Sequence, residues 1–138
     1  MARQWVLSPH TGGVKVPEAV QRRTVQRIEK YAATHFAGKY KRLDIRFRGP
    51  LCYVDAFVKP EDPSKEVLAQ TGEAREQFMS RVREVPVRLF RLRHFAENRW
   101  SAAFFTYSNE RYEPTMFMNG SFFGTPEEAF EHLAVYLR

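Results

Sequence analysis

The sequence predicts an α+β fold in which a single antiparallel sheet of about six strands packs against helices from both ends of the chain. Apolar residues recur at helical spacing in 17–37 and 125–138, and apolar and polar side chains alternate with a period of two in 42–59. Half of the aromatic residues fall in 86–124, between short polar breaks. We expect 86–124 to form a four-stranded meander on which both terminal helices pack on one face.

The composition is that of one globular unit. The chain has 138 residues, of which 43% are hydrophobic and 28% charged, so we expect a single domain spanning 1–138. No apolar run approaches the roughly 20 residues that cross a bilayer, and residues 1–8 lack the apolar core of a signal peptide. The single cysteine, Cys52, fits a reducing compartment. These features predict a cytoplasmic protein without a membrane partner.

The charge balance favours polyanionic partners. The formal net charge is +6 and the pI is about 9.7, and arginine is strongly preferred over lysine. Basic domains typically bind nucleic acid or anionic lipid. Guanidinium groups bind phosphate with two hydrogen bonds, although a biased genome composition produces the same excess of arginine.

The N-terminal part is predicted to be a turn-rich opening followed by a helix. Residues 5–7 predict a short edge strand or a segment tucked against the body, and 10–13 predict a flexible turn. Pro17 suits the first turn of a helix that ends at Gly38. The polar face of this helix is basic, which is typical of a solvated face and less often of a phosphate-contacting helix. Its cations are Arg22, Arg23, Arg27 and Lys30.

Residues 42–59 predict a β-hairpin that turns at Gly49-Pro50. Pairing Arg48 with Leu51 sets the register of the whole hairpin. The inner pairs are then Phe47 with Cys52, Ile45 with Val54, and Leu43 with Ala56. The outer pairs are Arg46 with Tyr53, Asp44 with Asp55, and Arg42 with Phe57.

The pairing of Asp44 with Asp55 is the most chemically suggestive feature of the hairpin. Two carboxylates across a ladder repel each other and need a metal, a shared proton or a neighbouring arginine. Arg42 and Arg46 lie on the same face, and neutralisation by these arginines is the preferred interpretation. A divalent-metal-dependent enzyme built on the two aspartates is the less favoured alternative.

Residues 60–85 predict a mobile connection that carries one helix. An amphipathic pattern runs through 73–84, and a shorter helical pattern ends at Thr71-Gly72. We expect the helix to cap an edge of the sheet or part of its other face.

In the meander, a loop at 96–99 is predicted to pair Phe95 with Trp100. The inward pairs are then Leu92 with Ala103 and Phe90 with Phe105, while Arg93 beside Ala102 and Arg91 beside Phe104 share the outer face with Trp100. Asn119-Gly120 predicts a type I′ hairpin that pairs Phe117 with Phe122. Thr125, Pro126 and Glu128 predict a capping box that opens the last helix.

These registers predict a nucleic-acid interface on the outer side of the sheet, in a protein that is not an enzyme. Phosphate contacts are assigned to Arg42, Arg46, Arg91 and Arg93, and stacking surfaces to Tyr53, Trp100 and Phe104. Arginines over rings also serve simply to shield them. No catalytic residue, metal site or cofactor is predicted, because no motif for such a site occurs. A protein-interaction or self-associating module is the main alternative.

Four segments of the chain, 10–15, 42–49, 104–112 and 122–130, are similar to short bacterial proteins that carry no assigned activity. The similarity extends over most of the chain. It implies a small stand-alone bacterial domain and assigns no site residues.

Overall fold

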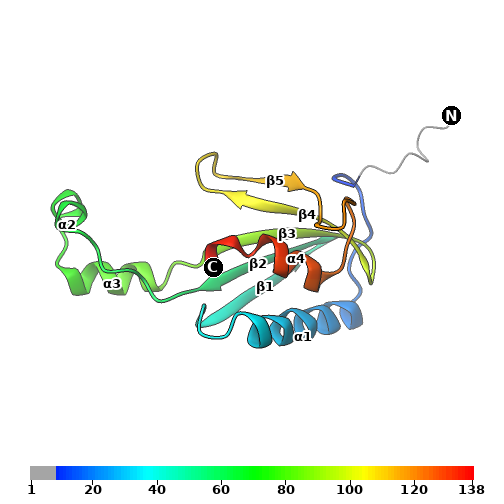
Figure 1. Cartoon of the computed structure of the whole chain (residues 1–138), viewed down its shortest axis with the longest axis horizontal. Helices are drawn as coiled ribbons and strands as arrows, with labels where there is room; N and C mark the ends of the chain where they lie inside the picture. Colours follow the sequence, from blue (N-terminus) through cyan, green and yellow to red (C-terminus); the bar gives the residue numbers. More distant parts are fainter. Residues whose placement is uncertain (1–8) are drawn as a thin grey trace.

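The computed structural model describes residues 9–138, so the edge strand predicted at 5–7 lies outside the described residues. Five strands form one antiparallel sheet in chain order (Figure 1). They are β1 (Arg42–Arg48), β2 (Leu51–Phe57), β3 (Val87–Ala96), β4 (Arg99–Thr106) and β5 (Arg111–Thr115). The helices are α1 (Glu18–His35), α2 (Lys65–Thr71), α3 (Arg75–Arg83) and α4 (Pro126–Leu133), followed by a 3₁₀ turn (Val135–Leu137).

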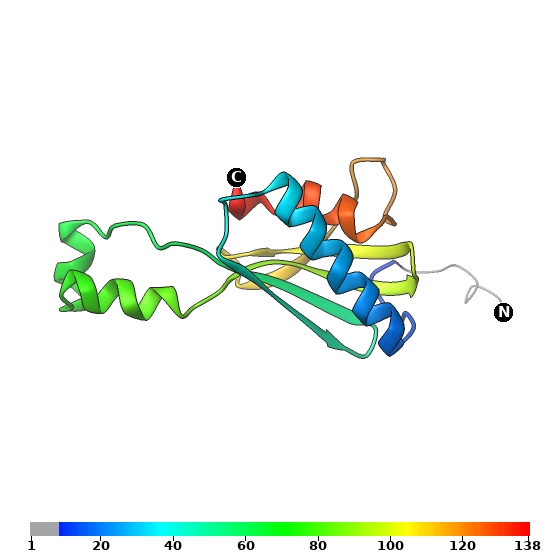
Figure 2. The ribbon, with the colours of Figure 1, turned by 90° about the horizontal axis from the view of Figure 1, so that it is seen from below.

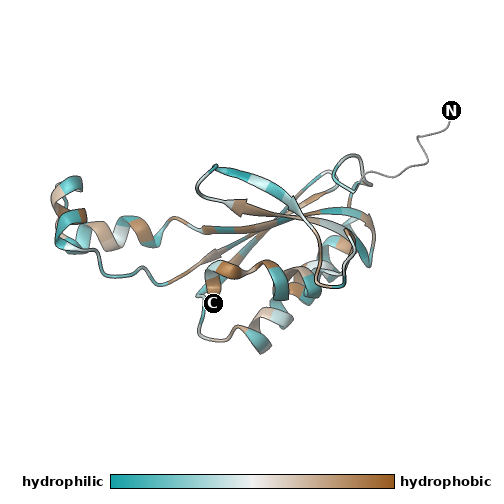
Figure 3. Ribbon diagram, turned by 45° about the horizontal axis from the view of Figure 1, so that its top comes forward, coloured by the Kyte–Doolittle hydropathy of each residue, from teal (hydrophilic) through white to brown (hydrophobic). Residues whose placement is uncertain are grey.

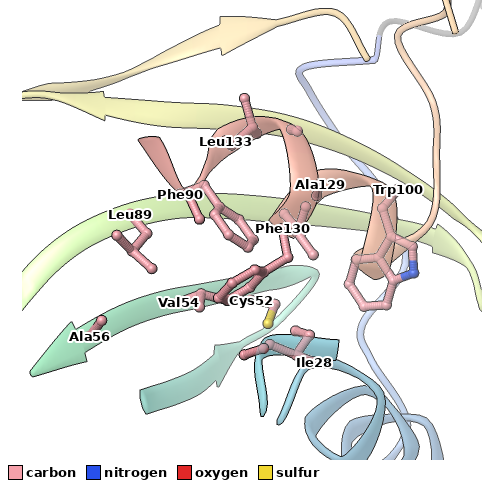
Figure 4. Packing of buried hydrophobic residues seen from close by; sticks show 14 of the residues in the cluster. Ile28, Cys52, Val54, Ala56, Leu89, Phe90, Trp100, Ala129, Phe130 and Leu133 are labelled. Atoms are coloured by element: carbon pink, nitrogen blue, oxygen red, sulfur yellow. The ribbon is translucent and has the colours of Figure 1, made fainter. Parts of the chain in front are cut away.

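Helices α1 and α4 cover one side of the sheet, here called the inner face, and the opposite side is called the outer face (Figures 1 and 2). Phe130 of α4 points at the sheet, where its ring lies 5.9 Å from that of Phe90 and 5.0 Å from that of Phe36 (Figure 4). The core around it is fully buried at Ile28 and Val54. The predicted α+β class with terminal helices on one face is therefore confirmed.

Polar contacts fix the two helices to each other and to the sheet. Arg27 of α1 binds Glu127 of α4 through two hydrogen bonds of 2.8 and 2.7 Å, and Arg23 binds Glu97 in the same way at 2.6 and 3.0 Å. The predicted capping box of Thr125 and Glu128 is present. Two of the four cations on the polar face of α1 are therefore held by carboxylates.

The β1–β2 hairpin has the predicted register at every pair, from Arg42 opposite Phe57 to Arg48 opposite Leu51. Beyond it, a bulge separates the pairs Val54–Phe90 and Asp55–Arg88. The two consecutive residues Leu89 and Phe90 are both fully buried as a result. Arg88 and Arg91 therefore flank the bulge on the outer face.

The predicted β3–β4 register is wrong by one residue. His94, not Phe95, lies opposite Trp100, and Phe90 lies opposite Phe104. Phe95 is left over in a second bulge, where its ring packs 5.4 Å from that of Phe123. A one-residue slip moves every side chain of a strand to the opposite face, so the residues assigned to the two faces of β4 are exchanged.

The sheet has five strands, which is compatible with the predicted count of about six, whereas the predicted type I′ turn is wrong. The chain leaves the sheet after Thr115 and returns at Gly124, which forms an isolated bridge with Trp100. Asn119 does not have the positive φ that a type I′ turn requires, and the turn is closed by a bond from Phe117 N to Ser121 O. At Gly124 a Cβ atom would lie 2.4 Å from the Phe117 ring, so this close approach needs glycine.

The segment 60–85 contains two helices rather than one, and they do not cap the sheet. Helices α2 and α3 lie beyond one end of the sheet and form an arm (Figures 1 and 2). Hydrophilic and hydrophobic residues are mixed along the arm (Figure 3). Met79 is the one buried residue of the two helices of the arm, so the arm contributes little to the core.

Between residues 9 and 138, no helix combines the length and the apolar character needed to cross a bilayer.

Replacing Phe130 with alanine is expected to destabilise the protein by about 3–5 kcal/mol, because it leaves a cavity where α4 meets the sheet. Phe122 is the matched control, since its side chain is 42% exposed. Phe122→Ala is expected to change the free energy of unfolding by about 0.5 kcal/mol or less. Urea unfolding of both variants measures the difference, and equal effects would contradict the assigned core.

Candidate nucleic-acid interface

The structure keeps five of the seven predicted site residues on the outer face: Arg42, Arg46, Arg91, Arg93 and Tyr53. The other two assignments are wrong. Trp100 is fully buried, and its indole N–H donates to Glu97 O at 2.9 Å. Phe104 lies partly buried against the core of the inner face. Both errors follow from the bulge at Phe95, which no sequence pattern indicates.

Three further residues belong to this face: Arg88, Phe105 and Tyr112. The first bulge places Arg88 opposite Asp55, and Phe105 pairs with Tyr112 across β4 and β5. The ring of Tyr112 contacts those of Tyr53 at 5.6 Å and Phe105 at 5.1 Å, so aromatic side chains from three strands form a continuous row. In the sequence, only the alternation of side chains along β4 could have indicated that Phe105 lies on the outer face, and using it required the correct register of β4 against β3.

Each of four guanidinium groups lies over an aromatic ring of the same face. The distances from Cζ to the ring centroid are 3.8 Å for Arg42 over Phe57, 5.7 Å for Arg46 over Tyr53, 5.0 Å for Arg88 over Phe105, and 5.3 Å for Arg91 over Tyr112. Cations and rings thus alternate across the face.

Arg46 is neutralised by the two aspartates that the sequence placed opposite each other. Its Nη1 donates to Asp55 Oδ2 at 2.9 Å and also to Asp44 Oδ2. The predicted neutralisation by a neighbouring arginine is confirmed for Arg46, whereas Arg42 stacks on Phe57 instead. The guanidinium lies between the carboxylates, where a shared metal would have to bind. In the described part of the chain, no group of three or more His, Cys, Asp or Glu residues could hold a metal ion.

Asp55 is a buried ionisable group on the outer face. Its side chain is 4% exposed, and Oδ1 has no hydrogen-bond partner among residues 9–138. Burial raises the pKa of this carboxyl group, and the hydrogen bond from Arg46 opposes the rise. Burial and the charge of Asp55 together raise the pKa of Tyr112 to about 12. The aspartate therefore serves to hold Arg46 at a cost in desolvation.

Arg91 and Arg93 differ from Arg46 because neither forms an ion pair with a residue of 9–138. Residues 1–8 contain no aspartate or glutamate. Both side chains are half-buried, and Arg93 Nη1 donates to the backbone oxygen of Gly12 at 2.9 Å. Burial and the charge of Arg91 lower the pKa of Arg93, and burial and both arginines lower that of His10. Positive charge is thus concentrated here without compensation.

Fold and site together define a small basic α+β protein whose five-stranded meander carries guanidinium groups and aromatic rings on its outer face. Comparison with protein-family models found no match to the chain, and comparisons with curated proteins and with solved structures found no significant similarity. The interpretation of the site therefore depends on its own chemistry.

Replacing Asp55 with asparagine is expected to raise the melting temperature at pH 7. The folded state raises the pKa of this carboxyl above its unfolded value near 4, so the ionised form opposes folding. Asparagine mimics the protonated form. The advantage of the variant should therefore shrink as the pH falls below the raised pKa and vanish below the unfolded one.

Asp44→Asn is the matched control, because Asp44 binds the same guanidinium with a side chain that is 40% exposed. Melting curves from pH 3 to pH 7 measure both variants. The claim that ionised Asp55 opposes folding is refuted if Asp55→Asn is less stable than the native protein at pH 7. It is also refuted if the melting temperatures of the two variants show the same pH dependence.

Proposed function

We propose that the protein binds single-stranded nucleic acid on the outer face of its sheet. The observation that carries the proposal is the pair formed by Arg91 and Arg93, which are half-buried and have no carboxylate partner. Two neighbouring guanidinium groups that are partly dehydrated gain strongly from an incoming phosphate, because it removes their mutual repulsion. Arg42 and Arg88 add cations toward one end of the same face, whereas Arg46 is already paired.

The aromatic rings favour a single strand over a duplex. Tyr53 and Tyr112 are half-buried on this face and contact each other edge to face. Unpaired bases stack on such rings, and stacking is tolerant of sequence because every base has a flat face. A duplex keeps its bases inside and would meet only the arginines. The combination of rings and cations therefore supports a stacking platform with a phosphate track beside it.

A self-associating module is the second candidate, and it is favoured by a different surface. The loop 116–123 exposes Met118 by 79%, Met116 by 43% and Phe122 by 42%. Apolar side chains exposed together are typical of an interaction surface. Sedimentation that depends on protein concentration, without any shift on adding oligonucleotide, would select this candidate.

The double variant Arg91→Ala/Arg93→Ala is expected to bind a fluorescent single-stranded oligonucleotide about tenfold more weakly at physiological salt. It removes two phosphate contacts, so the slope of log K against log salt should fall by about 1.4. Fluorescence anisotropy at several salt concentrations measures both quantities.

Arg22→Ala/Arg83→Ala is the control, because it removes the same charge from exposed positions outside the face. It should leave the slope unchanged. An equal loss of affinity in both variants would show that only the net charge matters. An affinity of the native protein that does not respond to salt would refute phosphate binding.

Replacing Tyr53 with alanine is expected to weaken binding by about 5- to 100-fold without changing the salt slope, because one stacked base contributes about 1–3 kcal/mol. Tyr53→Phe keeps the ring and should bind like the native protein. If Tyr53→Phe loses as much affinity as Tyr53→Ala, the hydroxyl group and not the ring makes the contact.

A further inference from the structure

A cleft of about 670 Å³ lies at the end of the sheet from which the arm extends. Four separate parts of the chain line it: the loop 38–41, the segment 58–61, Val82 of α3, and residues 136–138. Figure 2 shows the C-terminal turn beside the loop that joins α1 to β1. The volume is in the range of pockets that hold small molecules.

The walls of the cleft are anchored to the body of the protein. Lys41 N donates to Phe57 O at 2.7 Å, and Lys39 N donates to Phe36 O at 3.0 Å. The hydroxyl group of Tyr136 donates to Phe105 O at 2.7 Å, and Tyr40 packs against the core. The shape of the cleft therefore depends on the folded sheet and not on mobile side chains alone.

The cleft combines an apolar lining with a basic rim. Tyr40, Val58, Val82, Tyr136 and Leu137 supply apolar and aromatic surface. Lys39, Lys41 and Lys59 line the same space, and none of them is ion-paired within residues 9–138.

The negative charge beside these lysines is small. Arg138 also lines the cleft, but its guanidinium lies 3.6 Å from the carboxylate of Glu131. Glu61 is the one acidic side chain among the described residues that line it. The lysines therefore leave an excess of positive charge over a lining that suits a flat or apolar group.

We infer that this cleft binds an organic phosphate with an aromatic or apolar body, of which a nucleoside triphosphate is one example. The lysines would meet the phosphates, and the body would rest on Tyr40 and Val58. A lysine ammonium group binds phosphate as a point charge without a fixed geometry, so three flexible lysines suit a chain of phosphates. This site is separate from the outer face, and the inference does not depend on the proposed function.

Calorimetric titration of the full chain with ATP, tripolyphosphate and adenosine tests the inference. ATP combines the charge and the aromatic body, and each of the other probes has one of them. We expect saturable binding of one ATP, with both other probes at least about tenfold weaker, since each lacks contacts worth more than 1.4 kcal/mol. Lys41→Ala/Lys59→Ala should weaken ATP binding by at least about tenfold.

Two controls make the outcome decisive. Lys15→Ala/Lys65→Ala removes two exposed lysines elsewhere, and Arg91→Ala/Arg93→Ala removes cations of the outer face. Both should bind ATP like the native protein. No saturable binding, binding that resists loss of Lys41 and Lys59, or tripolyphosphate that binds as tightly as ATP would overturn the inference.

Discussion

Burial of one side of the sheet beneath α1 and α4 is the constraint on which the rest of the structure depends. Phe130 is central to it, because its ring contacts rings from α1 and from β3. Once these side chains are inside, alternation along each strand sends their neighbours to the outer face. The arginines of β1 and β3 are therefore on the outer face because the apolar residues between them are needed in the core, and the surface chemistry is a consequence of how the core is packed.

The alternation of side chains along a strand predicts which face of the sheet each one lies on only where the strand has no bulge. The β1–β2 hairpin has a two-residue turn and no bulge, so its seven pairs follow directly from the pattern of residues. In β3 the bulges at Leu89 and Phe95 each add a residue that no partner opposes. Their causes are tertiary: Leu89 is needed in the core beside Phe90, and Phe95 packs on Phe123, which is distant in sequence. Local pattern therefore predicted the arginines correctly and misplaced Trp100 and Phe104.

The outer face contains partly buried charges of two kinds, those with an ion-pair partner and those without one. Around Asp55, two carboxylates share one guanidinium, so Arg46 is fully engaged and has little left to offer a phosphate. Around Arg91 and Arg93, the guanidinium groups have rings, a backbone oxygen and each other as neighbours. Unpaired charge in a partly dehydrated site is costly unless a counter-charge arrives. The sequence contained all these residues, but only the fold shows which cations are neutralised.

The other basic surfaces also differ in how many of their cations are ion-paired. On α1, Arg23 and Arg27 bind carboxylates of Glu97 and Glu127 and so attach the helix to the rest of the protein. These two arginines of the basic helix therefore have a structural role. Two groups of unpaired cations lie beside rings or apolar side chains, one on the outer face and one in the cleft at the base of the arm. These places meet where Lys41, which lines the cleft, precedes Arg42, which stacks on the outer face. Among residues 9–138, β1 is an edge strand of the sheet. The side chains that line the cleft are nevertheless different from those of the outer face, so loss of Arg91 and Arg93 leaves the lysines of the cleft in place.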